Sequence, residues 1–249
     1  MDIPFLNNAG SGTLRRRVIL AATGHAVLAG VEDDFHHFVV KLEHDGSHVT
    51  NVGAESRRTP WVTCPQSSML LKELIGVPLT TEIHAGTRHI DPHSQCTHQY
   101  DLARMALAQA VRGGRRQYDI EVTDPVDGIR RVLLARDGQT LIDWRIKGVL
   151  LLSPPELAGI NVRKMNMQAL AASDQEMAEA VSVVRRALML SEGRGIDYDR
   201  IPDPTVFADR MSGACYSFQP GRIPFATRNK GTVRDFTDTP DLPLKGFPA

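Results

Sequence analysis

The sequence has no apolar run that approaches the roughly 20 residues needed to cross a bilayer, which excludes a helical membrane-spanning protein. It also has no net charge, because 29 basic side chains balance 29 acidic ones. This balance removes the electrostatic case for nucleic acid or an anionic membrane as the main partner. The three cysteines are an odd number, and the N-terminus lacks a basic region followed by an apolar stretch. We therefore expect free thiols, no signal peptide and a reducing cytoplasm.

Several catalytic signatures are also missing. The chain has no glycine-rich phosphate loop, no dinucleotide fingerprint and no Gly-x-Ser-x-Gly elbow, so nucleotide-dependent chemistry and ordinary serine hydrolysis lack support. Histidine is absent after His98, and all nine histidines lie between His25 and His98. Two of the cysteines, Cys64 and Cys96, fall in the same stretch. Imidazole and thiolate supply most acid–base, nucleophilic and soft-metal chemistry, so the first hundred residues are the place to look for function.

The hydrophobic pattern predicts an α+β fold with an antiparallel sheet or sheets and about three helices. Apolar runs and turn signals predict early strands near residues 18–22, 26–31, 35–43 and 48–54, and a second β section over 118–152. Helical signals cover residues 67–75, 97–111 and 174–191, the last with Ser173 and Glu176 as a capping box. We predict a flexible arm over residues 1–14, a single domain over 15–220 and an extended C-terminal tail over 221–249.

Alternation in the strand over residues 35–43 separates two neighbouring histidines. His36 shares a face with Phe38, Val40 and Leu42, whereas His37 lies on the opposite face. His36 is therefore predicted to point inward and His37 outward. An inward histidine is compatible with a catalytic role, and equally with a core histidine that is hydrogen-bonded to a backbone carbonyl.

His98 and Cys96 lie at the predicted start of the helix over residues 97–111. His98 lines up with Leu102 and Met105, which places it at the edge of the buried face and suits a pocket wall. The positive end of a helix favours neutral imidazole and thiolate, so Cys96, and Cys64 before its own helix, are candidate reactive thiols. The alternative is that both are small buried hydrophobic residues.

The remaining histidines carry weaker signals. His84, His89 and His93 lie in one loop and are expected to be solvated, although with Cys96 and His98 they leave a zinc or iron site open. We expect the other three to lie at the surface or in turns: His25, His44 and His48.

Three short segments occur in chain order: Thr59-Pro60-Trp61-Val62-Thr63-Cys64, Cys96-Thr97-His98 and Gly213-Ala214-Cys215-Tyr216. Together with His36, they resemble a bacterial family catalogued as domain-of-unknown-function 2889, over roughly residues 15 to 220. The resemblance adds Cys215 and Tyr216 to the candidate site. The chain departs from the family pattern at Gln95 and Gln99, where the family usually has glycine and leucine, which implies an altered lining of the same site. By association, the resemblance implies an aromatic-type substrate.

Three functions follow as hypotheses. The first is a small-molecule lyase without an organic cofactor, which cleaves a C–C bond in a hydroxylated aromatic-type compound by acid–base chemistry. His36 and His98 would be catalytic, and Cys64, Cys96, Cys215 and Tyr216 would line the pocket. The second is a metal-binding hydrolase or cluster protein, with zinc or iron held by Cys64, Cys96, His98 and Cys215 and with His36 as a further ligand. The third is a non-catalytic binding module. The expected partner is a small molecule, and a homo-oligomer stays open.

Overall fold

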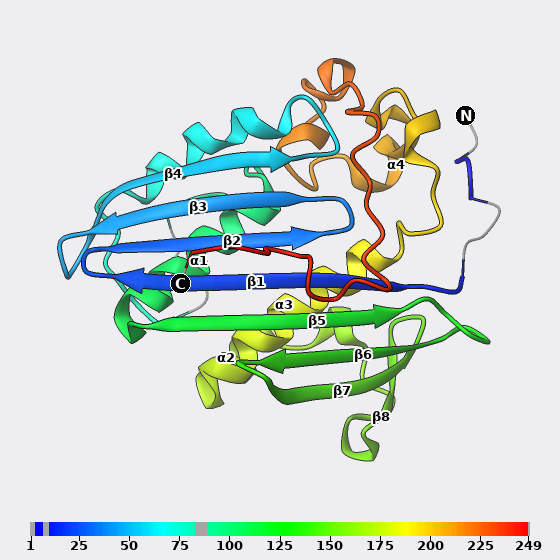
Figure 1. Cartoon of the computed structure of the whole chain (residues 1–249), viewed down its shortest axis with the longest axis horizontal. Coiled ribbons are helices and arrows are strands. Elements are labelled where there is room, and N and C mark those ends of the chain that lie inside the picture. Colours follow the sequence, from blue (N-terminus) through cyan, green and yellow to red (C-terminus); the bar gives the residue numbers. More distant parts are fainter. Residues whose placement is uncertain (1–2, 7–9, 83–88, 249) are drawn as a thin grey trace.

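The computed structural model describes residues 3–6, 10–82 and 89–248, and within them the strands form one eight-stranded antiparallel sheet. Its strand order is β4-β3-β2-β1-β5-β6-β7-β8 (Figure 1). The predicted α+β class is confirmed. The strands are β1 Thr13–Thr23, β2 Ala26–Asp33, β3 His37–His44, β4 Val49–Arg58, β5 Arg115–Thr123, β6 Ile129–Arg136, β7 Gln139–Lys147 and β8 Leu150–Ser153.

The helices follow each group of four strands. The α-helices are α1 Thr97–Arg112, α2 Met167–Ser173, α3 Gln175–Ser191 and α4 Ala208–Met211. A long 3-10 helix, η1, covers Cys64–Leu74, and shorter ones are η3 Pro155–Leu157, η4 Val162–Lys164, η5 Tyr198–Arg200, η6 Pro204–Phe207, η7 Tyr216–Phe218 and η8 Ile223–Phe225. The described part of the chain holds no helix with the length and apolarity that a bilayer span requires.

Two details of the predicted helices are corrected. The segment expected to be a helix over residues 67–75 is the 3-10 helix η1, which already begins at Cys64. The capping box with Ser173 is wrong, because Ser173 ends α2 and its hydroxyl donates to carbonyl oxygens of that helix. Asp174 caps α3 instead, and its carboxylate accepts the Met177 N–H at 2.9 Å.

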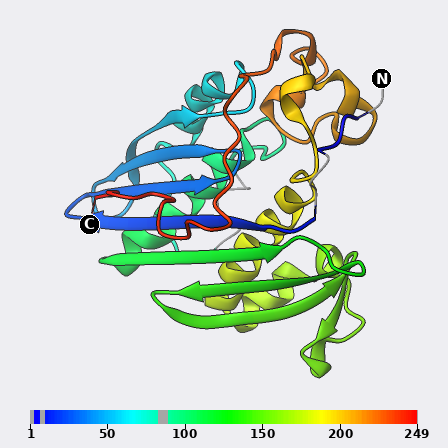
Figure 2. The ribbon, with the colours of Figure 1, turned by 45° about the vertical axis from the view of Figure 1, so that its right-hand side comes forward.

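The sheet has two differently covered faces. Helices α1, α2 and α3 lie against one face, while the C-terminal segment runs across β1 and β2 on the other (Figures 1 and 2). Strand β1 shows the alternation directly: Leu14, Val18 and Leu20 are buried in the main core. Arg16 has the same phase as these residues and is only 4% exposed. The strand period thus places one arginine of the Arg15-Arg16-Arg17 run on the helix-covered side.

Both ends of the chain differ from the simple arm and tail that we predicted. Strand β1 begins at Thr13, inside the expected arm, and Phe5 forms a β-bridge with Ile196. In the expected tail, Phe236 and Leu244 are buried. The Leu244 N–H donates to Glu32 at 2.7 Å, so this extended segment is fastened to the sheet.

Gly30 in β2 gives the C-terminal segment the space that it needs. A Cβ at this position would lie 2.4 Å from the ring of Phe247, whereas a Cβ at Gly53 in β4 would meet nothing within 4 Å. We expect Gly30→Val to displace the end of the tail and to speed tryptic cleavage after Lys245, and Gly53→Val to leave cleavage unchanged. Mass spectrometry of a digestion time course measures this, and equal cleavage in both variants would contradict the packing described here.

Candidate functional site

The turn between β2 and β3 is shaped by the side chain of Asp33. Its Oδ1 atom accepts the backbone N–H groups of Phe35 and His36, both at 2.9 Å. The Asp33 N–H in turn donates to the His36 carbonyl at 2.9 Å, which closes the hairpin. An aspartate that bonds the backbone two and three residues onward is a common way to fix a tight turn. The position of His36 is therefore set by Asp33 before any tertiary contact is considered.

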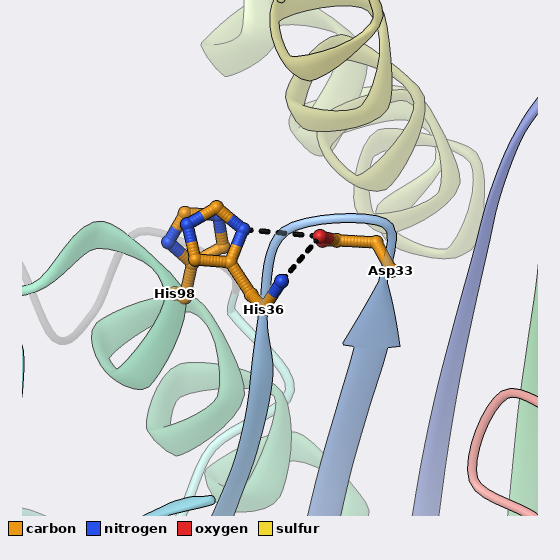
Figure 3. Close-up of side chains that lie close together, drawn as sticks. All are labelled: Asp33, His36 and His98. Carbon is orange, nitrogen blue, oxygen red and sulfur yellow. Dashed lines mark hydrogen bonds and ion pairs between the residues drawn. The ribbon is translucent and has the colours of Figure 1, made fainter. Parts of the chain in front are cut away.

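The same turn presents the His36 ring to helix α1. The His36 and His98 rings are stacked, with their centroids 3.8 Å apart and their planes 26° apart, and His36 Nδ1 lies 3.0 Å from Asp33 Oδ1 (Figure 3). Phe38 stacks against both imidazoles, with centroids 5.9 Å from His36 and 5.8 Å from His98. Both histidines are 7% exposed and Asp33 is fully buried. The structure thus brings together the two histidines that the strand and helix phases selected.

Charge pairing fixes the protonation of this group. Arg16 makes a salt bridge to the second carboxylate oxygen of Asp33, and both side chains are almost fully buried. Burial alone would raise the pKa of Asp33, but His36 and Arg16 hold it well below its ordinary value. An ionised carboxylate can only accept, so His36 Nδ1 carries the proton and donates to Asp33. His36 Nε2 is then left with its lone pair, as a base requires.

The two imidazoles are held neutral. Burial lowers the pKa of His36 against the opposing effect of Asp33, and it lowers the pKa of His98 further, with the help of His36 and Arg16. Among the described residues, His98 Nε2 has no hydrogen-bond partner although it is buried. Buried polar atoms in native proteins are nearly always paired, so this nitrogen is the atom of the pair that still has a hydrogen bond to make.

These lowered pKa values make the fold sensitive to acid. Below pH 6.5 the unfolded histidines take up protons that the folded ones refuse, so stability falls as the pH falls, by up to about 1.4 kcal/mol per pH unit for each histidine. We expect His98→Gln to flatten this dependence and a substitution of the exposed His48 by glutamine to leave it unchanged. Urea unfolding midpoints at pH 7.5 and 5.5 test this, and equal slopes in the parent and His98→Gln would disprove it.

No cysteine joins the cluster of Asp33, His36 and His98 among the described residues. Cys64 Sγ lies 3.5 Å from the Ser217 hydroxyl, which also accepts from Thr63 at 2.7 Å. Cys96 is the N-cap residue of α1 and is buried, and Cys215 is half-buried. Burial raises the pKa of Cys64 to about 11 and also raises the pKa of Cys96 and Cys215. The expectation that the helix starts favour thiolate is therefore wrong for Cys64 and Cys96, because desolvation exceeds the effect of the helix dipole.

None of the three cysteines forms a disulfide in the structure. We expect Cys64 and Cys96 to react slowly with dithionitrobenzoate in the native protein, because the attacking species is the thiolate and burial disfavours it. Cys215, which is less buried, should react first, and all three should react quickly in urea. A thiol titration time course measures this. Rapid native reaction of the Cys215→Ala variant, which keeps only Cys64 and Cys96, would contradict the burial argument.

Tyr216 directly follows Cys215 and contacts the loop that precedes α1. Its backbone N–H donates to the Gln95 carbonyl at 2.8 Å, and its ring lies under the Arg222 guanidinium, 3.8 Å from the centroid. Gln95 itself is fully buried, and neither side-chain amide atom has a partner among the described residues. Tyr216 therefore joins the C-terminal segment to the loop that precedes α1.

The other described histidines do not join the cluster of Asp33, His36 and His98. His37 Nδ1 faces Glu32 at 3.5 Å, while His25, His48, His89 and His93 are exposed. The surface prediction is wrong for His44, which is 8% exposed because its ring turns back over the hairpin and accepts the Gly46 N–H at 3.2 Å. His84 lies outside the described residues.

Possible metal ligands converge at one place in the described part of the chain. One donor atom each from Asp33, His36 and His98 lies within 4.8 Å of the others. No three of the predicted ligands Cys64, Cys96, His98 and Cys215 meet that criterion among the described residues. A metal centre, if one is held here, would use the carboxylate and two imidazoles.

The sequence interpretation missed Asp33, Arg16 and Arg58. Arg58 donates to the His36 carbonyl at 3.2 Å and to the Asp33 carbonyl at 2.5 Å, which secures the turn from outside. A signal was present for Arg16: it shares the strand phase of Leu14 and Val18, and a charge on an apolar face requires a partner. Arg16 and Asp33 are directly opposite each other in the pairing of β1 with β2.

A family model matches the part of the chain that contains most of this site. Residues 21–112 match the family model described as "Protein of unknown function (DUF2889)". Over this segment the chain is similar to that family, which is the one that its motifs predicted. The match contains Asp33, His36 and His98, whereas Arg16 and Cys215 lie outside it, so it is shorter than the expected 15–220. No curated protein matches the chain.

Proposed function

We propose that this protein is an enzyme, a lyase that uses His36 and His98 for acid–base cleavage of a C–C bond in a hydroxylated aromatic-type small molecule, without an organic cofactor. The observation that carries the proposal is the buried, stacked imidazole pair whose first member is oriented by an ionised carboxylate. A base that is oriented by a carboxylate and kept neutral at pH 7 is ready to accept a proton.

The proposed reaction needs one proton removed and one returned. His36 Nε2 takes the proton of a substrate hydroxyl, and a carbonyl forms as the adjacent C–C bond breaks. The electron pair of that bond passes to the departing carbon, where an aromatic or carbonyl group delocalises it. Protonated His36 then delivers the proton to that carbon. His98, in the tautomer with a proton on Nε2, donates a hydrogen bond to the oxygen on which negative charge develops.

A metal-dependent hydrolase is the second candidate, and the convergence of Asp33, His36 and His98 favours it. Against it, both oxygens of Asp33 are already engaged: one by two backbone N–H groups and His36, the other by Arg16. A guanidinium paired to the only carboxylate of the set also opposes a divalent cation electrostatically. For this reason we place acid–base chemistry first and zinc or iron binding second.

A direct screen tests the proposal. The purified protein is incubated with hydroxylated aromatic compounds, and released aldehyde is trapped and quantified. Aldehyde formation by a metal-free preparation supports the lyase. Stoichiometric zinc or iron that disappears in His98→Ala supports the metal candidate, and no turnover with no metal favours a non-catalytic binding module.

A further inference from the structure

The turn that carries His36 is bound from two sides. From the helix-covered face of the sheet, Arg16 pairs with the carboxylate of Asp33, which accepts two backbone N–H groups of the turn. From the other face comes Arg58, the last residue of β4, which lies directly opposite His37 in the pairing of β3 with β4. Residues opposite each other in an antiparallel pair share a face, so Arg58 shares the outer face with His37. The turn is therefore held between two arginines.

Arg58 binds three carbonyl oxygens of this turn with one guanidinium group. Its Nη1 donates to the Asp34 carbonyl at 2.9 Å. Its Nη2 donates to the Asp33 carbonyl at 2.5 Å and to the His36 carbonyl at 3.2 Å. A guanidinium presents several N–H donors in a fixed, planar fork, whereas the amine of lysine is a compact charge on a flexible stem. Lysine at this position could not hold the three oxygens together.

The C-terminal strap, residues 229–248, passes this turn and crosses the outer face of the sheet (Figures 1 and 2). The Thr232 carbonyl accepts from Arg58 Nη1 at 3.0 Å. Farther along the strap, the Leu244 N–H donates to Glu32 at 2.7 Å, and the same carboxylate pairs with Arg58 at 3.2 Å. The strap thus fixes the Arg58 side chain at two points, once directly and once through Glu32.

The strap also binds the turn itself. The Arg234 N–H donates to the Asp34 carbonyl at 2.8 Å, the oxygen that Arg58 also binds. Arg194 makes a salt bridge to the carboxylate of Asp34 and donates to the Thr237 hydroxyl of the strap at 3.2 Å. Because these contacts share Asp34, displacement of the strap would disturb the turn that ends at His36.

We infer that Arg58 is a positioning residue for His36 and that the C-terminal strap holds Arg58 in place. Arg58 acts through the backbone of the turn, from the face of the sheet opposite the helices. Release of the strap would loosen the His36 imidazole without any change in the residues around it. The reaction that His36 performs rests on the proposed function, but the position of its ring can be measured without turnover.

Nuclear magnetic resonance of the histidine side chains tests the role of Arg58. The signal that His36→Ala removes identifies His36, whose Nδ1 proton is donated to Asp33. We expect this proton to exchange with water at least about tenfold faster in Arg58→Lys, because the turn opens more often. Burial lowers the pKa of His36 and the charge of Arg58 lowers it further. Lysine keeps that charge, so faster exchange reports lost geometry.

Two further variants complete the test. Arg57→Lys is the matched control for Arg58→Lys, because Arg57 is the neighbouring residue on β4 and pairs with Glu55 at 3.0 Å. Arg234→Pro removes the N–H that binds Asp34 and should also speed exchange of the His36 proton, whereas Arg234→Ala keeps that N–H and should not. The strap variants cover the case in which Arg58→Lys does not fold, which circular dichroism shows.

Exchange at the parental rate in Arg58→Lys, or equally fast exchange in Arg57→Lys, would overturn the role of Arg58. Equal exchange in Arg234→Pro and Arg234→Ala would overturn the role of the strap. With a compound from the substrate screen, Arg58→Lys should lower kcat by about 10–100-fold and leave KM within about twofold, because the base is misplaced while substrate contacts are kept.

The two kinds of measurement separate this inference from the proposed function. If the exchange rates change as expected but no compound is cleaved, the positioning role stands and the lyase proposal fails. If Arg58→Lys releases aldehyde at the parental kcat, the lyase stands and the inference fails.

Discussion

Replacement of either imidazole is expected to lower turnover by about 10²–10⁴-fold, since this is the usual effect of removing a positioned acid or base. His36→Ala removes the base that Asp33 orients. His98→Ala removes the imidazole stacked on it, whose ring centroid lies 3.8 Å from that of His36. Rates of aldehyde release measure the loss, and circular dichroism with urea unfolding shows whether each variant keeps its fold.

The matched control is His37→Ala. His37 adjoins His36 in the chain but contacts Glu32 instead of the imidazole pair, so this variant should behave almost like the parent. Serine substitutions of the cysteines should have smaller effects than loss of either histidine, because their sulfur atoms would only line the pocket. Full activity in both His36→Ala and His98→Ala would remove the catalytic assignment, whichever compound is the substrate.

The second large effect concerns stability. Arg16→Met is expected to destabilise the fold by about 3–5 kcal/mol, because it leaves the buried carboxylate of Asp33 without its cation. Arg16 and Asp33 are 4% and 0% exposed, so water cannot replace the lost partner. The free energy of urea unfolding at pH 7.5 measures the change.

A double variant separates charge pairing from simple loss of packing. Arg16→Met combined with Asp33→Asn removes both charges, while an asparagine oxygen can still accept the N–H groups of the turn. It should therefore be more stable than Arg16→Met alone. The expectation is contradicted if the double variant is no more stable than Arg16→Met, or if Arg16→Met lowers the free energy of unfolding by less than about 1 kcal/mol. Either result would show that leaving the Asp33 charge unpaired costs little stability.

How far the sequence predicts this site depends on the range of the interactions involved. His36 could be selected because strand alternation is local and its neighbours Phe38 and Val40 are apolar. The pairing of Arg16 with Asp33 could also have been found. A two-residue turn at Gly24-His25, with Gly24 at φ +58°, fixes the β1–β2 register and places Arg16 opposite Asp33.

Other features depend on contacts that no local pattern contains. Arg186 comes from α3, far along the chain, and meets Asp101 only when both helices lie on the same face of the sheet. The thiols were misjudged for a related reason, because the helix start is local while burial of Cys64 and Cys96 is a property of the assembled core. The helix dipole lowers the pKa of these thiols and desolvation raises it, and only desolvation depends on the whole fold.

The central pairing of the sheet has a consequence for synthesis. Strand β1 pairs on one side with β2, its neighbour in the chain, and on the other with β5, so that Arg15 lies opposite Glu121. A nascent chain that has emerged as far as α1 can complete the β1–β4 half, but its β1 presents an open row of N–H and C=O groups. Such an edge is a template for association with another chain. Ribosome pausing before β5 emerges would therefore prolong the stage at which this protein most needs a chaperone.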